Sequence, residues 1–225
     1  MRTKRSHRGL SLVEILVAAA IAAIVSAAMA LTLSEGASRT ARAGQDTSLS
    51  VDLRQAIDYV SNEAQQAVRL YKPGSGSGEF STTVTGASGY QPIFAFFVPN
   101  FSTTDETDYL FRVLYLADPP ESGLYRGPKV LYLARDTTVY TGTPTTPPTN
   151  PPASVAAGEV VSDNLLAQNT ANGINAFRDD GTNAGSNSVR AGVLSLATTT
   201  TNMTGGTYGT TARTLTVSTR IAARN

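Results

Sequence analysis

A single apolar run near the N-terminus limits what this 225-residue chain can fold into. Residues 10–33, LSLVEILVAAAIAAIVSAAMALTL, are apolar at all but four positions: Ser11, Glu14, Ser26 and Thr32. As a helix, this run would be about 36 Å long, which is enough to cross a hydrocarbon core of about 30 Å. We therefore expect one membrane-spanning helix at residues 10–35.

The charges that flank this run predict its orientation. Four basic residues lie in the first nine positions and none lies in the run: Arg2, Lys4, Arg5 and Arg8. By the positive-inside rule the N-terminus is cytoplasmic and the rest of the chain is exported. Without these four residues, the chain has 14 of its 18 Lys and Arg residues and all 17 Asp and Glu residues. The formal net charge of this remaining part is therefore −3. This balance argues against broad electrostatic attraction to nucleic acid or anionic lipid.

The amino-acid composition excludes several kinds of catalytic and metal-binding site. The chain has no cysteine and no tryptophan, and His7, in the basic N-terminal stretch, is its one histidine. Disulfide frameworks, thiolate metal sites and cysteine nucleophiles are therefore excluded. Catalytic triads and histidine metal clusters are excluded with them once the N-terminal stretch is removed.

Two simpler interpretations of the N-terminus compete with a specialised one. A secretory signal peptide would be cut near Ala28-Met29-Ala30, and a plain anchor would keep the whole run. However, the run exceeds the 7–15 apolar residues of a typical signal. It also contains Glu14, and an acidic residue at the centre of a membrane helix costs about 2.5–3.5 kcal/mol. A carboxylate inside such a helix indicates a function.

The order of residues around this carboxylate resembles a known signal. Residues 8–14, RGLSLVE, followed by the apolar run, resemble the class III signal of type IV pilins and type II secretion pseudopilins. The resemblance implies that a prepilin peptidase cuts after Gly9, removes leader 1–9 and methylates Leu10. Glu14 then becomes the fifth mature residue. Leu10 departs from the phenylalanine that is most frequent at the first mature position of the family.

The resemblance also implies a function for Glu14 and a set of partners. Glu14 of one subunit would neutralise the α-amine of its neighbour, since a buried charge is tolerated when it is paired. The implied partners are other pilin or pseudopilin subunits, the prepilin peptidase, an inner-membrane assembly platform and, before assembly, the membrane. The head would be periplasmic, and the assembled filament periplasmic or at the cell surface.

Weaker local similarities point to a subtype. The 216 residues that follow Gly9, the missing cysteine pair and residues 51–56, VDLRQA, resemble PilW-like minor pilins and J-type minor pseudopilins. Residues 124–132, LYRGPKVLY, and the terminal Arg224-Asn225 resemble PilW-like and cyanobacterial pilin-like chains. We therefore expect a minor subunit that primes a filament or lies near its tip.

Beyond the membrane the sequence predicts a second helical segment, 36–72. Gly36 and Gly44 lie near the start of this segment, and each lowers the stability of a helix by about 1 kcal/mol relative to alanine. Apolar residues then recur every three or four positions, which indicates one face of an amphipathic helix that packs on the protein's own sheet. That face comprises Leu49, Leu53, Ile57, Val60, Ala64, Ala67, Val68 and Tyr71. Polar residues, Glu63 among them, fall elsewhere on the helix, and Lys72-Pro73-Gly74 ends it.

Residues 73–225 are predicted to form a β-rich globular head. The predicted strands are 92–98, 109–117, 129–135, 159–166, 174–177, 188–197 and 213–222, with a short piece at 124–125. Residues 141–158 are rich in proline and threonine and are expected to form an exposed loop. The predicted fold is therefore α+β and pilin-like, with a long helix across a mostly antiparallel sheet of four to seven strands.

Two acidic segments are candidate cation sites. Asp105, Glu106 and Asp108 cluster in a predicted turn. Asp179, Asp180 and Asn183 surround Gly181 like part of a calcium loop, but the complete EF-hand spacing is missing. Neither segment is assigned as a metal site and no cofactor is predicted. Some pseudopilins that resemble this chain bind calcium in the head, which leaves calcium as a candidate ligand.

Two other functions stay open. The residues Arg112, Arg126, Lys129 and Arg135, beside Tyr109, Tyr115, Tyr125 and Tyr132, are a candidate basic strip for DNA or an acidic glycan. This strip would suit an adhesin or DNA receptor at a filament tip. Alternatively, a membrane-anchored periplasmic hydrolase would use a pair of carboxylates, although no spacing in the sequence favours a particular pair.

Overall fold

The computed structural model describes residues 11–74, 79–80, 84, 86–102, 108–120, 124–125, 127–142, 158–168, 176–180, 189–200, 203–204, 207–208 and 213–223. The chain divides into two compact units, residues 1–45 and residues 46–225. Helix α1 (Leu12–Gln65) contributes its N-terminal part to the first unit and its C-terminal part to the second. The two units are described separately.

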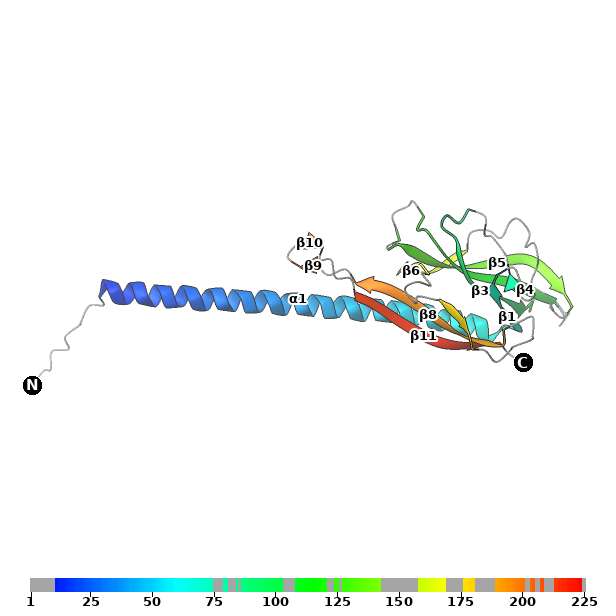
Figure 1. Cartoon of the computed structure of the whole chain (residues 1–225), viewed down its shortest axis with the longest axis horizontal. Coiled ribbons are helices and arrows are strands. Elements are labelled where there is room, and N and C mark those ends of the chain that lie inside the picture. Colours follow the sequence, from blue (N-terminus) through cyan, green and yellow to red (C-terminus); the bar gives the residue numbers. More distant parts are fainter. Residues whose placement is uncertain are drawn as a thin grey trace, which may run out of the picture. The chain divides into compact units, whose positions relative to one another are not determined.

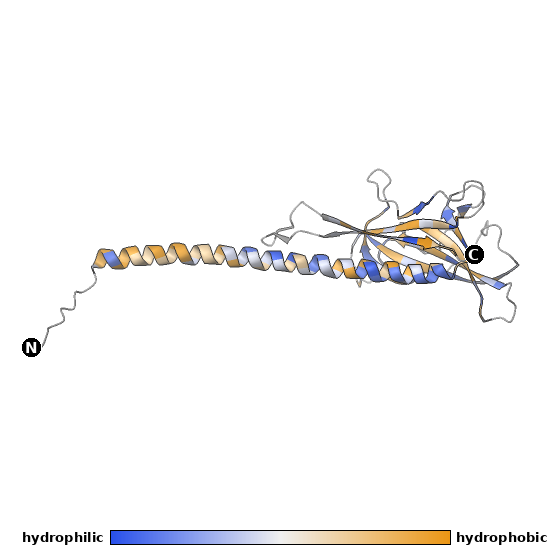
Figure 2. Ribbon diagram, turned by 90° about the horizontal axis from the view of Figure 1, so that it is seen from below, coloured by the Kyte–Doolittle hydropathy of each residue, from blue (hydrophilic) through white to orange (hydrophobic). Residues whose placement is uncertain are grey.

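The first unit is built on the apolar part of α1. Ser11 precedes the helix, and its hydroxyl accepts a hydrogen bond from the Val13 amide at 3.4 Å, which is the function of an N-cap serine. The large apolar side chains between Leu12 and Leu33 are all exposed. Figure 2 shows this part of the helix as mostly hydrophobic. Among the described residues, α1 is the one helix that is long and apolar enough to span a membrane.

The second unit contains a six-stranded sheet (Figure 1). Its spatial order is β2-β1-β3-β4-β5-β6, and every neighbouring pair is antiparallel except β1 and β2. The strands are β1 (Arg69–Pro73), β2 (Glu79–Phe80), β3 (Gln91–Pro99), β4 (Asp108–Ala117), β5 (Lys129–Thr141) and β6 (Glu159–Leu165). β6 is therefore an edge strand of this sheet.

A smaller antiparallel sheet lies beside it, with the order β11-β8-β7. Its strands are β7 (Phe177–Asp179), β8 (Ala191–Thr200) and β11 (Arg213–Ala222). The Val189 amide donates to the Leu70 carbonyl at 2.9 Å and links this sheet to β1. β9 (Met203–Thr204) and β10 (Thr207–Tyr208) form a separate short antiparallel pair.

One hydrophobic core lies between the C-terminal part of α1 and the two sheets. It takes the inward face of α1 together with alternate residues of the central strands. Its members include Leu53, Ala56, Ile57, Val60, Ala64, Phe94, Phe96, Leu114, Leu116, Leu131, Leu133, Leu194, Leu196 and Ile221. The helical periodicity predicted for this segment is thereby confirmed, since four of the predicted positions are buried here.

A second core lies on the opposite face of the six-stranded sheet. It takes the intervening residues of the same strands and includes Tyr71, Ala95, Phe97, Phe111, Val113, Tyr115, Val130 and Tyr132. Phe80 and Val84, from the segments around β2, are buried with them. Because both faces of β3, β4 and β5 are covered, their sequences are continuously apolar rather than alternating.

The sequence predicts the six longest strands, β3, β4, β5, β6, β8 and β11, with differences at their ends, whereas it does not predict β1 and β2, and the predicted strand 174–177 meets β7 only at Phe177. The prediction for β11 matches its bounds, whereas β5 continues six residues beyond Arg135 because it pairs with the start of β4, Asp108 opposite Thr141. No strand forms at 124–125. The predicted, mostly antiparallel sheet of four to seven strands is confirmed by the six-stranded sheet, while β7, β8 and β11 form a second sheet of their own.

The predicted end of the helix at Lys72 is also wrong. α1 ends at Gln65, and its last turn tightens through a hydrogen bond from the Ala67 amide to the Ala64 carbonyl at 3.0 Å. The chain then enters β1, where Leu70 and Tyr71 are buried on opposite faces of the sheet. This short apolar stretch fits both a helical and a strand period, and pairing with β3 decides between them.

We predict that Phe94→Ala strongly destabilises the head. Phe94 is completely buried and stacks near Phe96 and Phe177, at centroid distances of 5.5 and 5.0 Å. Its removal should lower the free energy of unfolding by about 3–5 kcal/mol. Urea unfolding of the detergent-solubilised chain, followed by tyrosine fluorescence, measures this. The control Leu124→Ala, at a side chain 78% exposed, should change it by less than about 0.5 kcal/mol, and equal effects would contradict the assignment of the core.

Candidate functional site

The acidic residue of the N-terminal signal lies in the first turn of α1. Glu14 is exposed there, between exposed apolar neighbours, and a carboxylate at a helix N-terminus is favoured by the helix dipole. Gly9 and Leu10 lie outside the described residues. Their assignment as processing residues therefore stays a prediction, as does the assembly function of Glu14.

The sequence leaves Glu14 without a basic side chain nearby on its own helix. After Arg8 the next basic residue is Arg39, which is more than six helical turns from Glu14. Arg39 itself pairs with Glu35 at 3.6 Å. In an apolar environment a carboxylate needs a counter-charge. For Glu14 that charge has to come from the chain's own N-terminal end or from another molecule.

The proposed basic strip on the head does not form a free surface. Arg112 of β4 forms an ion pair with Glu63 of α1, and both side chains are largely buried. Arg135 of β5 contacts the Glu63 carboxylate at 3.5 Å and that of Glu159 at 3.3 Å. It also donates to the Tyr59 hydroxyl at 3.0 Å. These five side chains, from α1, β4, β5 and β6, are called the clasp below.

Burial and charge repulsion both act on the clasp. The pKa of Arg112 is lowered from its usual value, chiefly because burial penalises the charged form, and also because Arg135 is close. Glu63 counters this by placing its carboxylate beside both guanidinium groups. Sequence reasoning placed Glu63 on a polar face of the helix. Its function was missed because the arginines that it meets lie about 50 and 70 residues further along the chain.

Lys129, the next member of the predicted strip, is also engaged within the head. Its ammonium group donates to Asp118 at 2.6 Å and to the Gly89 carbonyl at 2.8 Å, and its side chain is 11% exposed. Ser88 donates to the same carboxylate at 3.0 Å. These hydrogen bonds lower the pKa of Asp118. Arg126 lies outside the described residues.

The tyrosines of the predicted strip belong to the second core. Tyr115 and Tyr132 are buried and stack with a centroid distance of 5.2 Å and an angle of 10°. Tyr109 and Tyr125 are partly buried against the same core. The prediction of a free surface of aromatic and basic residues on these strands therefore gains no support from the described members, although Arg135 stays 48% exposed.

Of the carboxylates in the two candidate cation sites, those that the structure describes form contacts within the head. Asp180 receives a hydrogen bond from Arg220 at 2.8 Å, and Asp108 receives one from the Thr141 hydroxyl at 2.9 Å. Asn183, Asp105 and Glu106 lie outside the described residues. Within the described part of the chain, no three His, Asp or Glu residues are grouped as metal ligands. The calcium hypothesis gains no support from these contacts.

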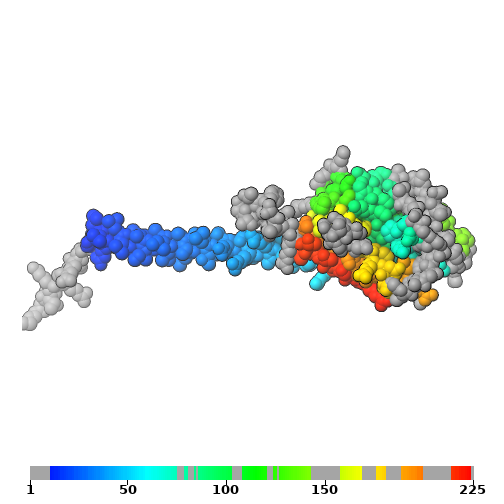
Figure 3. Space-filling view, in the orientation of Figure 1, coloured from blue at the N-terminus to red at the C-terminus, as the bar shows by residue number. Residues whose placement is uncertain are grey.

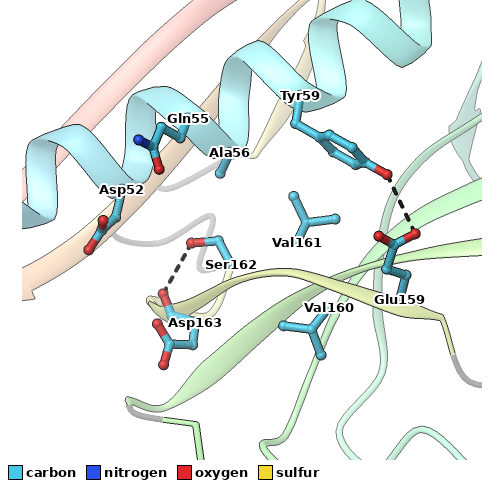
Figure 4. Close-up of a pocket in the computed structure, with 9 residues that line it drawn as sticks. All are labelled: Asp52, Gln55, Ala56, Tyr59, Glu159, Val160, Val161, Ser162 and Asp163. Carbon is cyan, nitrogen blue, oxygen red and sulfur yellow. Dashed lines mark hydrogen bonds between the residues drawn. The ribbon is translucent and has the colours of Figure 1, made fainter.

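A groove of about 580 Å³ lies between α1 and the edge strand β6 (Figure 4). Helix residues line one wall and strand residues the other: Asp52, Gln55, Ala56, Tyr59, Glu159, Val160, Val161, Ser162 and Asp163. Three of these residues are acidic and none is basic. The sequence analysis missed this groove because its two walls are about 100 residues apart in the chain.

The described elements define the class of protein: an α+β chain of pilin-like architecture, with a long N-terminal apolar helix and a mostly antiparallel β-head. A family model described as the prokaryotic N-terminal methylation motif matches residues 4–30. This match supports assignment to the type IV pilin and pseudopilin family, without resolving the subtype. No curated protein and no solved structure matches the chain.

We predict that Glu63→Gln destabilises the head by about 2–4 kcal/mol, because it leaves two neighbouring guanidinium groups without their shared carboxylate. Urea unfolding of the detergent-solubilised chain measures this. The matched control is Glu159→Gln, at the exposed end of the clasp, where the side chain is 56% exposed. That change should cost less than about 1 kcal/mol, and a cost equal to that of Glu63→Gln would contradict the central position of Glu63.

We also predict a dependence of stability on pH that arises from Asp118. Because its pKa is lower in the folded chain, its contribution is complete above the unfolded pKa of about 3.9 and is lost as the pH falls through the folded value. Asp118→Asn should therefore flatten the loss of stability below about pH 4. Thermal unfolding between pH 2 and 6 tests this. Asp58→Asn, at an exposed helix position, is the control and should leave the slope unchanged.

Proposed function

We propose that this chain is a structural subunit of a type IV pilus or a type II secretion pseudopilus. The observation that carries the proposal is the methylation motif at residues 4–30, which overlaps the exposed apolar part of α1 and includes Glu14. A prepilin peptidase would cut after Gly9 and methylate Leu10. The apolar part of α1 would first hold the subunit in the membrane and then pack against the helices of other subunits.

The proposed function is not enzymatic. The motif family consists of structural subunits. In addition, the carboxylates at the centre of the clasp and of the Lys129 pair are occupied by cationic partners. The alternative of a membrane-anchored hydrolase needs two carboxylates that are free to act on a substrate, so these contacts give it no support.

The location and partners follow from the same proposal. Before assembly, the subunit would cross the inner membrane once, with a cytoplasmic N-terminus and a periplasmic head. Its partners would be the prepilin peptidase, an inner-membrane assembly platform and other pilin or pseudopilin subunits. We further propose a minor subunit, present in few copies per filament, on the similarity of residues 51–56 to PilW-like and J-type subunits.

The alternative of a tip adhesin or DNA receptor has less support. It depended on the strip of Arg112, Lys129 and Arg135, and these side chains are paired inside the head. A DNA-binding function would have to use a different surface. Salt-sensitive binding of DNA by the intact chain would revive this alternative.

The mass of the N-terminal peptide tests the proposal. Isolated from its native membrane, the mature chain should begin at an N-methylated Leu10. Gly9→Leu should block cleavage and leave the chain starting at Met1. A natural chain that starts near Leu31, or that keeps Met1, would contradict the filament function.

We predict that Glu14→Gln abolishes assembly without affecting processing. The variant removes the charge that would neutralise a neighbouring α-amine but keeps the size of the side chain. Sheared filament fractions should lose the subunit by about tenfold or more, while N-terminal sequencing still finds Leu10 first. Ser26→Ala, at another exposed polar position of the same apolar run, is the control and should assemble normally. Normal assembly of Glu14→Gln would remove the proposed function of this carboxylate.

A further inference from the structure

The groove between α1 and β6 has the features of a binding surface for a cationic group. Its acidic side chains come from both walls: Asp52 from the helix, and Glu159 and Asp163 from the strand. Glu159 contacts Arg135 and Tyr59, yet its side chain remains 56% exposed. Asp52 is exposed on the helix surface. The groove therefore presents negative charge to the solvent.

The groove also offers apolar surface and the edge of a sheet. Ala56 and Val161 belong to or pack against the core below it, so they form an apolar floor. β6 pairs with β5 on one side, while on the other side its C-terminal end contacts β8 through Asn164 and Thr198. The part from Glu159 to Ser162 faces the groove (Figure 4). An arginine side chain suits such a site because its stem packs on apolar atoms while its head pairs with carboxylates.

The same head carries a complementary basic surface on its small sheet. Arg178 of β7 and Arg220 of β11 both lie opposite Val193 of β8, so these three residues share one face of the sheet. It is the outer face, because Leu194 and Leu196 are buried on the other side. Arg178 is exposed, and so is Arg190 just before β8. The small sheet lies at the visible surface of the head in Figure 3 (yellow to red).

We propose that the groove binds the arginine-bearing outer face of the small sheet in an adjacent copy of this chain. The argument is charge complementarity between a groove whose lining has three acidic and no basic side chains and a face that carries Arg178 and Arg220. Arg220 already pairs with Asp180, which leaves Arg178 to enter the groove. The two surfaces differ, so the contact is heterologous, and a heterologous contact that does not close extends into a filament.

This proposal rests on the filament function and adds the contact between heads. The contact requires at least two adjacent copies of the chain. A short run of adjacent copies in the filament meets this requirement and is compatible with a subunit that is present in small numbers. Paired charges across an interface select the correct register and neighbour. The contact would therefore orient the heads, whereas the apolar helices hold the subunits together.

Disulfide cross-linking can test the contact directly, because the natural chain has no cysteine. One copy carries Ser162→Cys in the groove, and a second, differently tagged copy carries Val193→Cys between the two arginines. Neither change removes a charge. Mild oxidation of native membranes and filaments should give a dimer that carries both tags. In the control pair, Gln65→Cys, at an exposed helix position outside the groove, replaces Ser162→Cys and should give no dimer.

Charge reversal then tests the complementarity. Asp52→Arg in the groove copy should lower the yield of cross-linked dimer about tenfold. Arg178→Asp in the other copy should do the same, and the two reversals together should restore most of the yield. Both sites are exposed, so the reversals leave the core intact.

The N-terminal mass, measured on the same samples, separates the possible failures. A chain that starts at methylated Leu10 and enters filaments, but gives no dimer above the control, overturns the proposed contact and leaves the filament function standing. The same holds if the groove cysteine cross-links to a different protein, because the occupant is then not a second copy. A chain that is never cut after Gly9 overturns both proposals.

Discussion

The burial of one face of α1 against two sheets is the interaction on which the head depends. Leu53, Ile57 and Val60 bring that face to alternate residues of β3, β4 and β5 and to the inner residues of β8. Without the helix, the leucines and phenylalanines on this side of the sheet would face water. Removal of such apolar surface from water is the main source of folding free energy.

The clasp adds directional contacts between the helix and three strands to the apolar packing, which has no directional preference of its own. Glu63 approaches two arginines that belong to neighbouring strands, and Tyr59 and Glu159 complete the arrangement one turn away. A buried charge is costly unless its partner is correctly placed, so a shift of the helix by one turn would leave Arg112 unpaired. The same geometry places Asp52 and Tyr59 opposite β6 and forms the groove.

The apolar part of α1 poses the opposite physical problem. Its large side chains have no partner among the described residues of the first unit, so they need a membrane or other helices. Glu14 has the same need for a counter-charge. In the proposed function these needs would be met on assembly, and the most specific sequence motif lies in the part of the chain that has them.

The sequence by itself determined the N-terminal signal, the apolar helix, the buried face of α1 and the strands from β3 to β6, because these depend on local order and periodicity. Only the tertiary structure decided where the helix ends, which strands form the second sheet and which charged side chains are paired within the head. At 67–71 two periods fit equally well, and pairing with β3 selects the strand. Arg112, Arg135 and Lys129 resemble a surface strip in the sequence, yet Glu63 and Asp118 neutralise them from distant positions. Long-range pairing of charges leaves no local pattern in a chain, which is why the clasp and the groove became visible only in the folded head.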